Sequence, residues 1–226
     1  MTLPELTRRS GYSKTTTHRL LTTLVLAGWL ERTASGGFRL TIKAFQLGTI
    51  VLDGLDLCRE ASPIMSALSA DTGATVYLMV PTGVAATCLE RIDPRHAIRV
   101  LDVDVGGSQL LHVGAAPRAL LAVDERGLLP ALLRVGQELS ENRSLVDPRQ
   151  LKADLAAIRQ RGYSIVRDDV TVGLGAPVFD SRGRAAAALS VGALIGDFGA
   201  AEETGLAGRL LLACGELSTR LGADVS

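Results

Sequence analysis

The chain has 226 residues, of which 47% are hydrophobic, which is enough for a medium-sized core and a smaller one. Its 24 basic and 24 acidic residues cancel overall but are unevenly placed. Residues 1–50 carry seven Lys or Arg against two Asp or Glu, so they have a charge of +5, and the remainder of the chain has −5. This asymmetry predicts an amino-terminal segment that contacts a polyanion and a carboxy-terminal part that does not.

Composition also excludes several classes of protein. No apolar run reaches the roughly 18 residues that a membrane span needs, and the first residues lack the pattern of a signal peptide. The three cysteines, Cys58, Cys88 and Cys214, are odd in number and far apart, so neither a disulfide framework nor a zinc site is expected. We therefore expect a cytoplasmic protein with no membrane contact, no cofactor and buried thiols.

The first elements read as two helices joined by a turn. Thr2 followed by Glu5 is the spacing of a capping box, and the short helix that it opens ends near Gly11. Ser13 can cap a second helix. On that helix four apolar residues share one face and are expected to point inward: Leu20, Leu21, Leu24 and Val25.

The pattern then changes to a hairpin. Two short extended runs flank Ser35-Gly36-Gly37, a composition typical of a hairpin tip, and this completes a winged helix-turn-helix over residues 1–41. Residues 42–55 have helical spacing and predict a linker helix.

Residues 56–226 predict an α+β domain. Helices are expected at 56–72, 116–134, 147–162 and 200–222. Strands come in pairs, around Pro81-Thr82-Gly83 and around residues 180–183, which favours an antiparallel sheet over a parallel one. Gly173 and Gly175 are interpreted as a bend.

The second helix carries the pattern that points to function. With its leucines turned inward, the side chains near its amino end that point outward are donors: Lys14, Thr15, His18 and Arg19, after the cap Ser13. In a helix-turn-helix this face enters the major groove, where such groups reach base edges and phosphates, and Arg39 would flank the groove. The alternative reading is a solvated basic face.

Long stretches of the chain resemble the IclR family of bacterial transcription regulators. They include LPELTRRSGYSKTTTHRLLTTLVLAGWLER, LDLCREASPIMSALSADTGATVYLMV, LLHVGAAPRALLA and GRAAAALSVGAL. The resemblance implies a winged helix-turn-helix, a linker helix and a GAF-like effector-binding domain, assembled as a homodimer or homotetramer. It also implies an effector pocket that includes Leu110, Ala115, Ala116 and Ser190.

The chain departs from the family pattern in two places. Family members begin with another helix before the segment equivalent to residues 2–10, so we expect a truncated or misassigned start. In the pocket, Ala115-Ala116-Pro117-Arg118 stands where Gly-x-Gly-Lys is common, and Gly192 stands where a second hydroxyl is common. The pocket is therefore expected to be less polar than usual, and its effector to be an aromatic or partly apolar organic acid.

The resulting prediction is a ligand-responsive, sequence-specific regulator that binds a double-stranded DNA operator and a small organic acid. The second hypothesis is a metabolite-sensing domain that does not bind DNA, because the first helix is missing. An enzyme is the third, and no GxSxG motif, metal cluster or spacing of nucleophile and base supports it.

Overall fold

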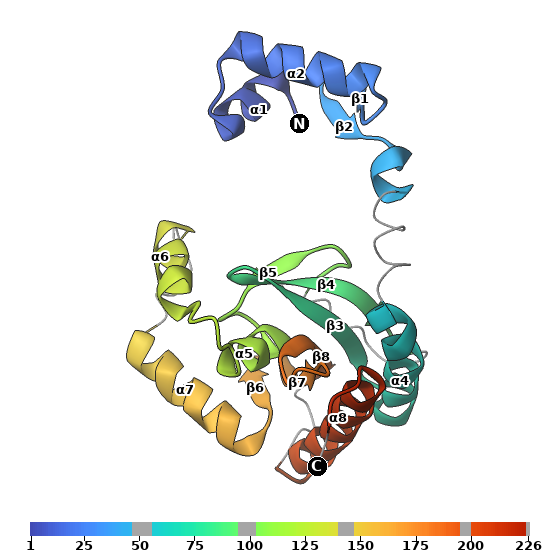
Figure 1. Ribbon diagram of the computed structural model, residues 1–226, viewed down its shortest axis with the longest axis vertical. Coiled ribbons are helices and arrows are strands. Elements are labelled where there is room, and N and C mark those ends of the chain that lie inside the picture. Colours follow the sequence, from blue (N-terminus) through green and yellow to red (C-terminus); the bar gives the residue numbers. More distant parts are fainter. Residues whose placement is uncertain (47–55, 95–102, 140–146, 195–199, 225–226) are drawn as a thin grey trace. The chain divides into compact units, whose positions relative to one another are not determined.

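The computed structural model describes residues 1–46, 56–94, 103–139, 147–194 and 200–224. The chain divides into two compact units, Met1–Asp56 and Leu57–Ser226 (Figure 1). Among the described residues, no helix is long and apolar enough to cross a membrane.

The amino-terminal unit contains two helices followed by a hairpin. Its elements are α1 (Leu3–Ser10), α2 (Lys14–Leu26), β1 (Leu30–Arg32) and β2 (Phe38–Leu40). The carboxylate of Glu5 accepts hydrogen bonds from the backbone N–H and the hydroxyl of Thr2, at 2.7 and 3.0 Å. It thereby gives a hydrogen-bond partner to a backbone N–H at the start of α1 that has none within the helix. These hydrogen bonds lower the pKa of Glu5, the backbone bond most. The predicted order of helix, turn, helix and hairpin is confirmed.

One part of the predicted core of this unit is wrong. Leu21 is buried, with 6% of its surface exposed, and Val25 is half-buried, but Leu20 and Leu24 are 45% and 41% exposed. The four residues span too wide an arc of α2 for the neighbours present in the unit, because α1 and β1 cover only one stripe of the helix. Thr17 is buried beside Leu21 and bonds the carbonyl of Ser13.

Residues 42–46 are helical, which is the first part of the predicted linker helix. The rest of that prediction, residues 47–55, lies outside the described residues.

The second unit is built on one six-stranded sheet in the order β5-β4-β3-β8-β7-β6, and every neighbouring pair is antiparallel. This confirms the predicted α+β class and the antiparallel sheet. The strands are β3 (Thr75–Thr82), β4 (Ala85–Ile92), β5 (Ser108–Leu110), β6 (Ser164–Arg167), β7 (Thr171–Phe179) and β8 (Ala185–Leu194).

Helices cover both faces of this sheet (Figure 1). They are α4 (Asp56–Thr72), α5 (Ala115–Ala122), α6 (Leu129–Leu139), α7 (Pro148–Arg161) and α8 (Ala200–Arg220). Because side chains alternate along a strand, Val76 and Leu78 face a core shared with α4 and α8, whereas Tyr77 and Met79 face a core shared with α5, α6 and α7.

The single helix predicted over 116–134 is wrong, because the structure has two helices there. α5 ends at Ala122, and α6 begins at Leu129. Between them Gly127 has φ +70°, and the carboxylate of Asp124 accepts a hydrogen bond from the N–H of Leu128 at 2.9 Å. The carboxylate therefore binds a donor at the start of α6 and stabilises the break between the helices.

Candidate functional site

The amino-terminal half of α2 presents an exposed row of hydrogen-bond donors. Lys14, Thr15, His18 and Arg19 are all exposed, and the helix from Lys14 to Leu26 contains no acidic residue. Ser13 caps the helix as predicted, since its hydroxyl accepts a hydrogen bond from the N–H of Thr16 at 3.2 Å. Five of the six residues that the sequence predicts for DNA contact therefore lie together at the amino end of α2, and the sixth, Arg39, lies in the hairpin.

Arg39 is in a different electrostatic setting. It lies opposite Glu31 in the β1–β2 hairpin, and its Nε donates to the carboxylate of Glu31. Arg32, on β1, has its guanidinium 5.4 Å from the centre of the Phe38 ring. Glu31 thus partly neutralises the charge of Arg39, and the Phe38 ring holds the guanidinium of Arg32. Lys14 and Arg19, in contrast, lie on a helix that contains no acidic residue.

Lys43 contacts the carboxyl end of α2. Its Nζ donates to the carbonyl of Ala27 at 2.9 Å and lies 4.9 Å from the centre of the Trp29 ring. A cation at this position satisfies a free carbonyl and complements the negative end of the helix dipole. The lysine thus fastens the start of the linker segment to α2.

The second candidate site lies at the start of α5. Ala115 and Ala116 are buried there, and together with Ser190 of β8 they line a cavity of about 20 Å³. Gln109 lines it too, but its neighbour Leu110 does not, because adjacent residues of β5 point to opposite sides. Three of the four residues that the resemblance implies therefore line this cavity, whereas Leu110 does not.

The size of this cavity sets a physical constraint. Between the described residues it offers room for about one water molecule. Ser190 is 8% exposed, and its neighbours across the sheet are Tyr77 and Gly175. Within the described part of the chain, the buried hydroxyl oxygen of Thr75 has no hydrogen-bond partner, and Thr75 lies next to Gly192 on the same sheet face. An organic acid could enter only if side chains moved.

Two residues that hold α5 against the sheet, Gly175 and Ser164, were not predicted from the sequence. A Cβ on Gly175 would lie 2.4 Å from the carbonyl carbon of Ala115, so only glycine allows the helix to approach β7 this closely. Ser164 of β6 adds a buried hydrogen bond, in which its hydroxyl donates to the carbonyl of Ala115 at 2.6 Å. The interpretation of Gly173 and Gly175 as a bend is wrong, since both lie inside β7.

Two polar residues near the start of α5, His112 and Arg118, have partners outside the small cavity. The Nε of Arg118 donates to the carbonyl of His112 at 2.8 Å, and its guanidinium lies 3.7 Å from the carboxylate of Asp154. Burial lowers the pKa of His112, and the nearby charge of Arg118 adds to this effect. His112 is therefore a neutral, packed residue at neutral pH.

The cysteines offer no reactive thiolate. Cys88 and Cys214 are buried, and burial raises the pKa of Cys88 to about 11 and that of Cys214 to about 12. Cys58 is half-buried, and its pKa is also raised by burial. Among the described residues, no group of three His, Cys, Asp or Glu side chains could hold a metal ion.

Comparison with known proteins agrees with this architecture. Residues 1–34 match the IclR helix-turn-helix domain, and residues 49–219 match the carboxy-terminal domain of the bacterial transcriptional regulator IclR. The chain is 31% identical over 196 residues to the transcriptional repressor IclR of Escherichia coli (strain K12), a match covering 84% of this chain and 71% of that protein. It is 29% identical over 195 residues to the HTH-type transcriptional regulator KipR of Bacillus subtilis (strain 168), covering 84% and 78%.

A solved structure shows the same fold. The crystal structure of the Thermotoga maritima IclR superposes with a TM-score of 0.72 at 21% identity, over 98% of this chain and 91% of that one. With both family models matched in order along the sequence and the same fold in a crystal structure, the chain belongs to the IclR family of transcriptional regulators, and it combines a helix-turn-helix DNA-binding unit with an effector-binding domain.

Proposed function

We propose that this chain is a ligand-responsive, sequence-specific regulator that inserts the amino-terminal half of α2 into the major groove of an operator. Lys14, Thr15, His18 and Arg19 would contact base edges and phosphates, with the Ser13 hydroxyl at the helix cap and Arg39 at the wing beside them. The observation that carries this proposal is the exposed donor row on a helix without acids, in a segment of charge +5.

Assembly as a homodimer or homotetramer belongs to the same proposal. One small helix-turn-helix unit contacts only a few base pairs, and regulators of this type gain affinity by placing two recognition helices in successive major grooves, about 34 Å apart or a multiple of that distance. The operator is therefore expected to contain two related half-sites.

The effector proposed for the second unit is a small organic acid. Free backbone N–H groups at the start of α5 can bind a carboxylate, although Pro117 removes one donor there. Buried Ala115 and Ala116 and the hydroxyl of Ser190 give the site its mixed apolar and polar character. Since the cavity is only about 20 Å³, binding is expected to rearrange side chains around α5.

The DNA contact is tested by a mobility-shift titration with the DNA that flanks the gene. Replacing Arg19 by Ala should weaken binding roughly tenfold and reduce the slope of log K against log salt by about 1. Arg134→Ala is the matched control, because it removes the same charge from an exposed position on α6. Equal salt slopes for Arg19→Ala and the unchanged protein would rule out insertion of this face.

The effector is tested by a thermal-shift screen with aromatic and short-chain organic acids. A ligand at 100 times its dissociation constant stabilises the folded chain by about 2.7 kcal/mol. A positive acid should lose most of its effect in Ser190→Val, and it should change operator affinity in the unchanged protein. An acid that shifts both proteins equally does not bind at the α5 cavity.

A metabolite sensor without DNA binding is not favoured, because residues 1–34 match the helix-turn-helix family model and the donor row is exposed.

A further inference from the structure

A second cavity in the effector-binding unit has the size of a small-molecule site. It measures about 380 Å³ and lies between the end of β3, the loop that joins α5 to α6, and the turn that joins β7 to β8. Ligand pockets are typically about 300 to 1,000 Å³. The described residues that line it are all different from those that line the small cavity at Ala115 and Ser190.

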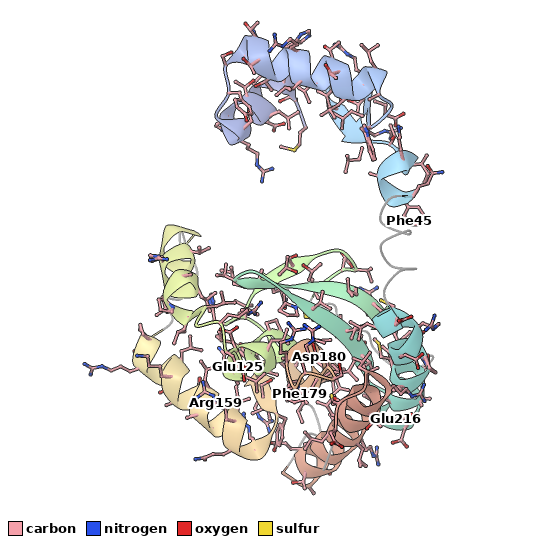
Figure 2. All side chains as sticks on the ribbon, in the orientation of Figure 1. Phe45, Glu125, Arg159, Phe179, Asp180 and Glu216 are labelled. Carbon is pink, nitrogen blue, oxygen red and sulfur yellow. The ribbon has the colours of Figure 1, made fainter. Side chains whose placement is uncertain are left out.

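The cavity combines apolar walls with a charged rim. Its apolar lining residues are Val80, Pro81, Leu120, Val123, Ala185 and Ala186. Charged side chains come from the two loops that border it, and Figure 2 labels one from each, Glu125 and Asp180. A pocket of apolar surface with a few polar groups is the usual form of a site for a small organic ligand.

Arg126 is held at this rim by a buried carboxylate. Its Nε donates to Asp124 at 2.7 Å, and the side chain of Asp124 is only 3% exposed. The second oxygen of Asp124 accepts the N–H of Leu128 at 2.9 Å, so both carboxylate oxygens are occupied. Burial opposes ionisation of Asp124, but these hydrogen bonds outweigh it and lower its pKa.

Arg184, in the β7–β8 turn, pairs with Asp180, whose side chain is 23% exposed. Its Nε and one terminal nitrogen donate to one oxygen of Asp180, at 3.2 and 2.9 Å. The other oxygen of Asp180 accepts the backbone N–H groups of Arg182 and Arg184, at 2.8 and 3.0 Å. All the carboxylate oxygens of the two aspartates accept hydrogen bonds. Each arginine has further guanidinium N–H groups beyond those that donate to its aspartate.

We infer that this cavity is a second ligand site, separate from the effector cavity proposed above, and that it binds a carboxylate with an apolar body of about the size of two fused rings. The carboxylate would accept hydrogen bonds from the remaining N–H groups of Arg126 and Arg184, which the aspartates hold in a fixed orientation. The apolar body would lie against the walls formed by Val80 and Ala186.

Calorimetric titration of the full chain with 2-naphthoate tests the site directly, without operator DNA. Saturable binding with a dissociation constant of about a millimolar or below is expected for a ligand of this size. Arg126→Gln should weaken it by about tenfold, the usual effect of a lost charged hydrogen bond. Ala186→Phe, which fills the cavity, should abolish it, and Glu125→Gln should strengthen it by removing a like charge from the rim.

Two controls separate this site from its alternatives. Arg182→Gln changes an exposed arginine of the same turn that does not line the cavity, so it should leave binding unchanged. Ser190→Val instead reports whether 2-naphthoate binds in the small cavity beside α5. Absence of saturable binding, equal loss in Arg182→Gln and Arg126→Gln, weakening in Glu125→Gln, or loss only in Ser190→Val would each overturn the proposal. A failed mobility-shift test would count only against the DNA-binding role.

Discussion

Gly175 of β7 lies directly against Ala115 in the first turn of α5, so closely that a Cβ on the glycine would be 2.4 Å from the carbonyl carbon of Ala115 and 2.6 Å from its oxygen. Both obstacles are backbone atoms, which cannot turn aside as a flexible side chain could. The helix that carries the proposed effector site is therefore positioned by a residue without a side chain.

Gly175→Ala should destabilise the effector-binding unit by about 1–3 kcal/mol or more, because the added methyl group forces α5 away from the sheet. Chemical denaturation followed by circular dichroism measures this. Gly208→Ala is the control: it lies inside α8, where a Cβ would meet no described atom within 4 Å, and it should stabilise the chain by about 0.5–1 kcal/mol. Similar midpoints for the two variants would contradict the close contact.

Ser164→Ala should cost about 0.5–1.5 kcal/mol of unfolding free energy. The substitution removes a buried hydroxyl that donates a hydrogen bond to the carbonyl of Ala115 at 2.6 Å. Ser66→Ala, on an exposed position of α4, should change stability by less than about 0.5 kcal/mol. If both variants unfold at the same denaturant concentration as the unchanged chain, the Ser164 hydrogen bond contributes nothing.

Lys43→Met should lower the stability of the amino-terminal unit by about 1 kcal/mol, because it removes both the hydrogen bond to Ala27 and the cation above the Trp29 ring. The chain has one tryptophan, so its fluorescence follows this unit selectively during denaturation. Lys14→Met, at the opposite end of α2, is the matched control and should not destabilise the unit, since a cation there opposes the helix dipole. Equal unfolding midpoints for Lys43→Met and Lys14→Met would show that the contacts of Lys43 with Ala27 and Trp29 do not stabilise the unit.

Stability should fall as pH rises from about 9 to 12, in part because of Cys214. Burial raises the pKa of this thiol from 9.0 to about 12. In that window the unfolded chain has lost the proton and the folded chain keeps it, so each pH unit favours unfolding by about 1.4 kcal/mol for this group. The curve of unfolding free energy against pH should be shallower for Cys214→Ala. Parallel curves would show that the thiol does not contribute.

The sequence predicted those features that depend on neighbouring residues. Ser13 caps α2 as predicted, since a short polar side chain next to an amphipathic run needs no distant partner to act as a cap. The pairing of β3 with β4 and of β7 with β8 also follows from turn residues close in the chain.

Features that depend on distant contacts could not be predicted. The exposure of Leu20 and Leu24 depends on how much of α2 its neighbours cover, which periodicity does not report. The role of Gly175 depends on Ala115, sixty residues earlier, and from the sequence alone its GxG pattern is indistinguishable from a bend. Of the candidate site residues, the exposed donors on α2 followed from helix geometry, whereas the presence of Gln109 and not Leu110 at the small cavity depends on where β5 lies in the sheet.

The central pairing of the sheet has a consequence for how this protein is made. Residues 75–79 of β3 pair with residues 188–192 of β8, so the middle of the sheet can form only after the ribosome has synthesised β8. Long-range strand pairing of this kind slows folding, and in a nascent chain that ends before β8 the edges of β3 and β7 that pair with β8 are left unpaired. Synthesis must therefore proceed almost to the last helix before this unit can fold, and prematurely terminated chains are expected to aggregate or be degraded.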